Sequence, residues 1–382
     1  MHPRIDALLK AAAAPDVIGL AGGLPAAELM PRAEIERALA DAARDDKALQ
    51  YGWPEGLADL RAWIAARLNA RGADVRPEHV IVTTGAQQAL LLIALAHRGA
   101  QIAVGEASYP AALAAFRRAG LDVVGDCTRG RIPLPRRPHL PPLRDTDCAH
   151  YVMPGIANPL GVDLVEPWRQ AWLAQHALIA DEAYTELRFD GGVARPLYAD
   201  APDRVWHVGT LSKTLCPGLR VGWLVPPIRD HELLLDHKEA ADLQTASLTQ
   251  AAAALLVSRI DYDALLEKAR HAYADRAATL CQALRAEIPD AVFVHPEGGF
   301  SVWVELPYDD GDDIDLLECA VNEGTSIDPG RLFRPRAIRN TAPLAFRASF
   351  SSAPIEQLPD AARRLGRAIG RWRSQPVMRK HA

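Results

Sequence analysis

Between residues 79 and 227, short apolar segments rich in Val and Ile alternate with longer segments whose apolar positions recur every three or four residues. The first pattern is typical of buried strands and the second of amphipathic helices. Seven segments have the strand pattern: HVIVTTG, AQIAVGEASYP, LDVVGD, AHYVMPG, ALIADEAY, RVWHVGTLSK and RVGWLVPP. Strands that alternate with helices predict an α/β fold with one large, mostly parallel sheet.

The pattern changes after residue 230. A long helical stretch, YDALLEKARHAYADRAATLCQALRAEI, precedes two strand-like segments, GGFSVWVEL and LAFRASFS, and a final amphipathic helix, IEQLPDAARRLGRAIGRW. This order predicts a second, smaller α+β domain. We expect residues 1–47 to form an N-terminal segment and part of the small domain, residues 48–270 the large domain and residues 271–382 the small one. The proline-rich segment 129–145 should be an extended connection.

Charge and composition narrow the class of partner. The formal net charge is -5 and charges of both signs are scattered, which favours small-molecule ligands over nucleic acid or an anionic membrane. The N-terminus lacks the pattern of a secretory signal and no run of 18 apolar residues occurs, so we expect a cytoplasmic protein. The five cysteines are not arranged as metal ligands, and no metal site is predicted.

Polar residues follow several of the predicted strands, where ligands of parallel sheets bind. Lys213 follows RVWHVGTLS and lies between Ser212 and Arg220, in the stretch SKTLCPGLR. An arginine and small hydroxyls suit a phosphate, and a lysine whose pKa is depressed suits Schiff-base chemistry. An ordinary exposed lysine is the alternative.

Three more strand ends carry polar groups of different kinds. VTTGAQQALLL predicts a strand, a glycine and a helix start, an arrangement that favours an anion at Gly85, Ala86 and Gln87. ALIADEAY supplies Asp181 and Tyr184, and YVMPGIANPLG supplies Asn158; a helix cap, a surface carboxylate and a turn are the structural alternatives. Together these ends offer a phosphate cradle, a carboxylate, a phenol, an amide and an amine, which pyridoxal phosphate requires.

Over nearly its whole length the sequence resembles the fold-type I, class I/II aminotransferases. It is most similar to the branch of 2-aminoadipate and kynurenine aminotransferases, which also supplies the C-terminal domain of MocR-type regulators. The resemblance rests on ordered motifs, namely GLAGGLPAAELMP, LQYGWPEGLADLR, VTTGAQQAL, GEASYPAALAAFRRAG, DEAY, SKTLCPGLRVGW, KEAADLQTASLTQ, GGFSVWVELP and LAFRASFS. It implies the pyridoxal-phosphate transferase fold, with pyridoxal 5′-phosphate as cofactor.

The resemblance also implies roles for the residues at the strand ends. Lys213 would form the internal aldimine and then carry the proton between Cα of the substrate and C4′ of the cofactor. Asp181 would keep the pyridine nitrogen protonated, and Tyr184 and Asn158 would bind the ring oxygen. Tyr109 would stack on the ring, and the phosphate would be bound by Gly85, Ala86, Gln87, Ser212 and Arg220.

Substrate and subunit contacts are implied in the same way. Arg347 would take the α-carboxylate of the substrate, next to Asn158, and the segment GGLPAAELMPR, with Gly23, would cover the substrate. Tyr51 would reach the phosphate of the neighbouring subunit's cofactor, which implies a homodimer with shared active sites.

The implied activity is transfer of an amino group from an L-amino acid to a 2-oxo acid, with 2-oxoglutarate as the expected acceptor, by a ping-pong mechanism. The same groups would also support a lyase, racemase, decarboxylase or cyclase, since the cofactor stabilises the Cα carbanion in most of these reactions. A ligand-sensing regulator is a further alternative. The basic winged-helix domain of such regulators has no counterpart ahead of IDALLKAAAAP, so we expect no DNA binding.

Overall fold

The computed structural model describes residues 3–374 apart from 13, 126–147, 164–165, 167–168, 308, 310 and 336–341. The proline-rich segment 129–145 lies outside the described residues, and its extended conformation stays a prediction.

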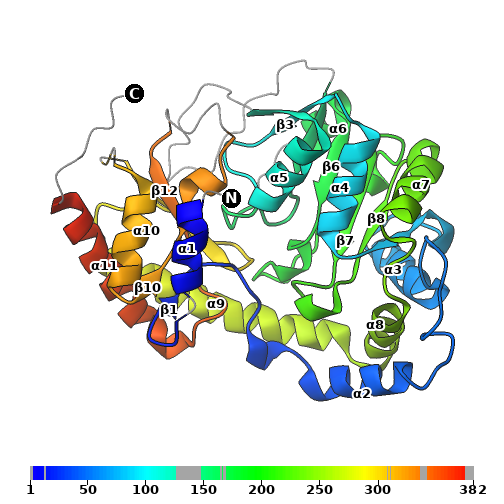
Figure 1. Ribbon diagram of the computed structural model, residues 1–382, viewed down its shortest axis with the longest axis horizontal. Helices are drawn as coiled ribbons and strands as arrows, with labels where there is room; N and C mark the ends of the chain where they lie inside the picture. Colours follow the sequence, from blue (N-terminus) through cyan, green and yellow to red (C-terminus); the bar gives the residue numbers. More distant parts are fainter. Residues whose placement is uncertain are drawn as a thin grey trace.

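Seven strands form the largest sheet, in the order β2-β8-β7-β6-β5-β3-β4 (Figure 1). Their bounds are Ile81–Thr83 (β2), Gln101–Val104 (β3), Asp122–Gly125 (β4), Ala149–Val152 (β5), Leu178–Asp181 (β6), Val205–Thr210 (β7) and Gly222–Val225 (β8). Only β8 runs antiparallel to the other strands of this sheet. Each predicted strand segment contains one of these strands, so the mostly parallel sheet is confirmed.

Helices accompany this sheet (Figure 1). They are α3 (Ala58–Ala70), α4 (Ala86–Ala96), α5 (Pro110–Ala119), α6 (Arg169–Gln175), α7 (His231–Asp242) and α8 (Ser247–Arg259). Two of them, α4 and α5, contact its strands. Helix α4 packs on β7 and β8 and buries Leu90, Leu92 and Ile93. Helix α5 ends at Gly120, whose φ of 92° is left-handed, as its sequence predicts.

The C-terminal part of the chain builds a second, smaller sheet in the order β11-β12-β9. The strands are Ser301–Leu306 (β9), Asp328–Pro329 (β11) and Leu344–Ser349 (β12), and they are packed with α9 (Tyr262–Glu287), α10 (Asp313–Asn322) and α11 (Leu358–Ser374). This arrangement agrees with the predicted α+β character of the C-terminal part. The domain boundaries stay a prediction, and α9 continues without a break across residue 270.

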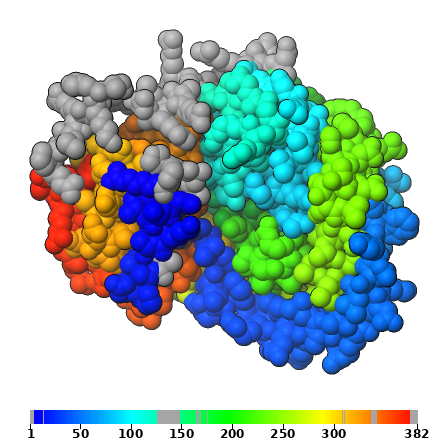
Figure 2. All heavy atoms as spheres, viewed as in Figure 1, coloured from blue at the N-terminus to red at the C-terminus, as the bar shows by residue number. Residues whose placement is uncertain are grey.

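The N-terminal segment joins both parts of the molecule. Helix α1 (Pro3–Ala11) packs on α10, and β1 (Ile18–Gly19) pairs in parallel with β10 (Thr325–Ser326). Helix α2 (Arg32–Ala42) packs instead on α8. In Figure 2 blue N-terminal residues accordingly lie both against the orange and red C-terminal part and beside the green residues of the other part. No helix in the described ranges is long and apolar enough to cross a membrane.

Candidate active site

The central strands of the large sheet carry the candidate residues to one edge. Asp181 is the last residue of β6, Lys213 lies three residues after β7, and Asn158 follows β5. Because β5, β6 and β7 are adjacent and parallel, their carboxyl ends meet at the same edge. Sequence motifs that are well separated along the chain are therefore brought together by the strand order.

Lys213 lies among aromatic rings at this edge. Its Nζ is 5.6 Å from the centre of the Tyr184 ring and 5.9 Å from that of Phe300. Burial lowers the pKa of Lys213; the neighbouring Arg347 also lowers it, whereas Asp181 opposes this effect. A lysine whose amine loses its proton more readily than usual is suited to attack a carbonyl carbon.

Asp181 and Glu182 are consecutive buried carboxylates with different surroundings. Burial tends to raise the pKa of Glu182, but Arg71 and His207 outweigh it and hold the value at about 2. Burial also raises the pKa of Asp181, which accepts hydrogen bonds from the Tyr151 hydroxyl (2.8 Å) and the Ala183 backbone. Among the described residues no arginine pairs with Asp181, so its carboxylate lacks the close cation that Glu182 has.

The His207 ring has a defined tautomer in this network. The Trp223 indole nitrogen donates to His207 Nε2 at 3.1 Å, and an indole can only donate, so Nε2 carries no proton. The proton of the neutral ring is therefore on Nδ1, which lies 3.3 Å from Glu182 Oε1. His207 and Arg71 thus lie next to different oxygens of the Glu182 carboxylate.

Tyr151 supports Asp181, and we expect Tyr151→Phe to lower the free energy of unfolding by about 1–3 kcal/mol, because a buried acceptor loses a donor. Urea unfolding of the cofactor-free protein measures the change. Tyr198→Phe is the matched control, since Tyr198 is also buried and no described group bonds to its hydroxyl. Equal effects of the two substitutions would contradict the supporting role.

Tyr184 and Asn158 present unused donors near Lys213. Tyr184 is 4% exposed, and no described group forms a hydrogen bond with its hydroxyl. Burial raises its pKa, so the phenol keeps its proton. Asn158 accepts from Arg347 Nη1 at 2.9 Å through its side-chain oxygen, which leaves its amide NH₂ free to donate. Both groups can therefore donate to an oxygen of a ligand.

The turn between β2 and α4 brings several hydrogen-bond donors together around Gly85. Gly85 caps α4 with a φ of 75°, and a Cβ added there would lie 2.6 Å from Arg220 Nη2. The N–H groups of Ala86 and Gln87 are in the first turn of α4 and have no partner within the helix. Arg220 itself donates to the Thr84 carbonyl at 3.1 Å. A glycine, two free N–H groups and a guanidinium suit a phosphate.

Gln87 and Ser212, two of the predicted phosphate ligands, also contact other groups of the protein. The Gln87 amide donates to the Ala111 carbonyl at 3.0 Å, so one of its two side-chain N–H groups is already used. The Thr210 hydroxyl has one proton and lies 2.9 Å from the Val221 carbonyl, which can only accept, and 3.0 Å from the Ser212 oxygen, so Ser212 donates its proton to Thr210 when Thr210 donates to Val221. A ligand that accepted from Ser212 would compete with its contact to Thr210, and the backbone N–H of Gln87 has no partner within the helix.

Arg347 approaches the site from the small sheet. It is buried on β12, directly opposite Asp328 of β11, and its Nε and Nη2 donate to Asp328 Oδ2 at 3.0 and 2.7 Å. The Phe333 ring lies 4.9 Å from the guanidinium, and Gly23 covers a face of it. A Cβ on Gly23 would lie 3.2 to 3.3 Å from three guanidinium atoms, so this residue has to be small. The contact with Asn158 joins the two sheets at the site.

Tyr109 lies near these groups at the start of α5, whereas Tyr51 lies at the surface. Burial raises the pKa of Tyr109, and Lys213, Tyr184 and Asp181 all act on it electrostatically. Tyr51 is instead 78% exposed at the surface.

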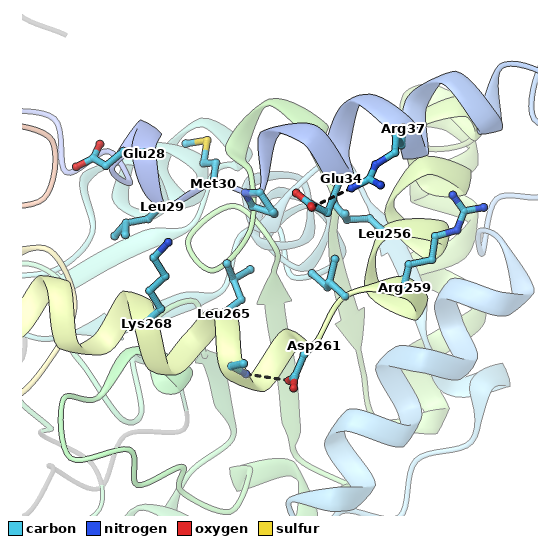
Figure 3. A pocket seen from close by; sticks show the side chains of 13 residues that line it. Glu28, Leu29, Met30, Glu34, Arg37, Leu256, Arg259, Asp261, Leu265 and Lys268 are labelled. Atoms are coloured by element: carbon cyan, nitrogen blue, oxygen red, sulfur yellow. Dashed lines mark hydrogen bonds and ion pairs between the residues drawn. The ribbon is translucent and has the colours of Figure 1, made fainter.

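A separate hollow of about 630 Å³ lies between the Glu28–Pro31 segment, α2, α8 and α9 (Figure 3). Glu34 pairs with Arg37 at its rim, and Asp261 caps α9 there. None of the candidate residues lines this hollow, so the candidate site lies elsewhere.

Comparison with known proteins agrees with this geometry. Residues 15–127 and 145–365 match the family described as aminotransferase class I and II. The chain belongs to this family. It is 33% identical to 2-aminoadipate transaminase of Thermus thermophilus over 96% of this chain and 93% of that protein. It is 32% identical to aromatic-amino-acid aminotransferase 1 of Thermococcus litoralis, over 96% and 91%.

A solved structure has the same fold. It is LysN, the α-aminoadipate aminotransferase of Thermus thermophilus, complexed with N-(5′-phosphopyridoxyl)-L-leucine. Its TM-score is 0.84 with 30% identity, over 98% of this chain and 96% of that one. This aminotransferase therefore has the fold-type I architecture, and its cofactor is pyridoxal 5′-phosphate.

The described residues fit this cofactor. Asp181 is a buried carboxylate without a close cation, and the pyridinium nitrogen would supply one. The phenol of Tyr184 has no hydrogen-bond partner among the described residues, and the Gly85 turn is a cradle that a Cβ would fill. When bound, pyridoxal phosphate provides an aldehyde for Lys213 and an electron sink for the Cα carbanion.

Two residues of the site were missed by the sequence interpretation. Tyr151 lies on β5 within an apolar run, and only the pairing of β5 with β6 brings it to Asp181. Asp328 lies on a strand of two residues that showed no alternation, and only the pairing of β11 with β12 brings it to Arg347. Neither residue gave a signal in the sequence, because strand order is a tertiary property.

Proposed function

We propose that this enzyme transfers the amino group of L-amino acids to 2-oxo acids by a ping-pong mechanism at the Lys213 site. The observation that carries the proposal is a partly buried lysine at the carboxyl edge of the sheet, close to the rings of Tyr184 and Phe300, whose pKa is lowered by burial and which interacts electrostatically with Asp181 and Arg347. The amine can accept the proton from Cα of the substrate and return it to C4′ of the cofactor. Asp181 would hold the ring nitrogen of the cofactor, and Arg347 the carboxylate of the substrate.

Each remaining residue has a proposed binding task. Tyr184 and the Asn158 amide donate to the ring oxygen, Tyr109 lies against the ring, and Gly23 covers the substrate next to Arg347. The phosphate is held by Gly85, Ala86, Gln87, Ser212 and Arg220. Support comes from the free donors of these groups and from the positive charge that Arg220 adds to the helix start.

The proposed donors are aliphatic, aromatic or dicarboxylic amino acids of medium size, and 2-oxoglutarate is the first acceptor to test. The names of the two relatives and the apolar rings of Phe300 and Tyr184 beside Lys213 support this range. A screen of the standard L-amino acids and 2-aminoadipate, with 2-oxoglutarate, pyruvate and phenylpyruvate as acceptors, tests it. New amino acid should form with several of these donors. Turnover of none of them would contradict the proposal.

A cytoplasmic homodimer without nucleic-acid partners is part of the proposal. The Leu49–Leu57 segment exposes large apolar side chains, including 61% of Leu49, 78% of Tyr51 and 76% of Trp53. Its backbone is nevertheless fixed, since Gly52 donates to Gln244 and Leu57 to Gln250. A rigid segment with exposed aromatic residues is typical of a protein interface, and Tyr51 would there reach the partner's cofactor phosphate.

For this interface we expect Trp53→Asp to shift the protein from dimer to monomer at micromolar concentration, because a charge would be buried between the subunits. Sedimentation velocity measures the change, and cofactor retention should fall with it. Ile228→Asp is the control, since Ile228 is 70% exposed outside the segment. A variant at position 53 that stays dimeric would exclude this segment from the interface.

A further inference from the structure

Asp328 already accepts hydrogen bonds from Arg347, the arginine that would bind the substrate carboxylate. The two side chains are 7% and 8% exposed, so their charges face each other with little water between them. Their opposite charges offset one another before any substrate arrives. A substrate carboxylate therefore meets a nearly neutral pair instead of an isolated guanidinium.

The arginine still has two donors for a ligand. Of its five N–H groups, the one on Nε and one of the two on Nη2 bond to Asp328, and one of the two on Nη1 bonds to Asn158. One N–H on each terminal nitrogen remains. A carboxylate can use both, but its negative charge then lies close to the carboxylate of Asp328.

We propose that Asp328 is a specificity-determining residue, whose negative charge weakens the binding of substrate carboxylates and favours monocarboxylic over dicarboxylic amino and oxo acids. The inference rests on the proposed function of Arg347. Each further negative charge on the ligand is repelled by the same aspartate, so a dianion loses more binding than a monoanion does.

The hydrogen bonds of Asp328 allow its charge to be tested separately from its geometry. Three donors, Arg347 Nε, Arg347 Nη2 and the Gly22 backbone, all converge on one oxygen, Oδ2. No described group donates to the other oxygen. Asparagine has one carbonyl oxygen in this shape, so Asp328→Asn can keep all three bonds while the charge is removed. Asp328→Ala removes both.

The experiment measures equilibrium binding of 3-phenylpropanoate and glutarate to the cofactor-loaded dimer by calorimetry. Asp328→Asn should bind glutarate about ten-fold more tightly or better, and 3-phenylpropanoate with a smaller gain. Asp328→Ala should bind both ligands less tightly than Asp328→Asn does, because Arg347 and Gly22 lose their common acceptor.

Unchanged or weaker glutarate binding by Asp328→Asn would overturn the inference and leave the proposed function in place. An Arg347→Ala variant separates the two ideas. If it binds both ligands as tightly as the native protein does, Arg347 is not the carboxylate site, and the proposed function of Arg347 fails together with the inference.

Discussion

Lys213→Ala is expected to abolish amino-group transfer, with a loss of about four orders of magnitude or more in turnover. Lys213 follows β7 at the carboxyl edge of the large sheet, and its lowered pKa favours the unprotonated amine, which is both a nucleophile and a base. Of the described lysines, Lys213 is the one whose pKa is influenced by both Asp181 and Arg347, so without its amine the site has no base to move the Cα proton.

The measurement is loss of deuterium from Cα of a deuterated amino-acid donor, followed by mass spectrometry. Native protein should exchange the label, and Lys213→Ala should not, although it should keep its fold and retain the cofactor. Added methylamine should restore part of the exchange. Lys268→Ala, at an exposed lysine of the hollow between α2 and α9, is the control. Exchange at the native rate in Lys213→Ala would exclude Lys213 as the base.

Asp181→Asn is expected to lower kcat by about 10³-fold, since a preorganised charge at the reacting group is lost. Asparagine keeps the shape, but Tyr151 and Ala183 donate to different oxygens of Asp181, so its single carbonyl oxygen can accept from only one of them. Asparagine carries no charge and cannot keep the ring nitrogen of the cofactor protonated, so the cofactor withdraws electrons less strongly. The other residues that bind the cofactor are unchanged. The burial that raises the pKa of Asp181 strengthens this interaction once a cation is present.

Steady-state kinetics and absorption spectra of the loaded protein test this prediction together. We expect kcat to fall much more than KM changes, and we expect the spectrum to show a bound cofactor in both proteins. Glu182→Gln is the comparison, because Glu182 is equally buried but is paired with Arg71 and His207. It should chiefly destabilise the fold. Near-native turnover in Asp181→Asn would mean that the carboxylate faces no ring nitrogen.

Much of the fold followed from local pattern. Each of the seven apolar runs became a strand because such a run can be buried on both faces in a parallel sheet, and the glycine after α5 ended that helix as expected. The order of the strands did not follow, since pairing depends on which faces the helices cover. The sequence motifs therefore predicted that Asp181, Lys213 and Arg347 belong to the site, but they did not predict the distances between these residues.

The residues that sequence reasoning missed are those whose role depends on pairing across strands. Tyr151 is one apolar-looking position among several on β5, and Asp328 precedes a proline and glycine as many turn residues do. Their partners lie 30 and 19 residues away, on neighbouring strands. Tyr51 could be named from its motif, but the task proposed for it requires a second subunit.

The central claim is that one site carries both halves of the transfer, and a half-reaction without acceptor tests it most directly. Loaded protein mixed with a donor identified by the screen should release about one 2-oxo acid per site while the amino group stays on the cofactor. Adding 2-oxoglutarate should then restore the original absorption spectrum and release glutamate. Continuous release of ammonia, carbon dioxide or the D-amino acid without an acceptor would contradict the account.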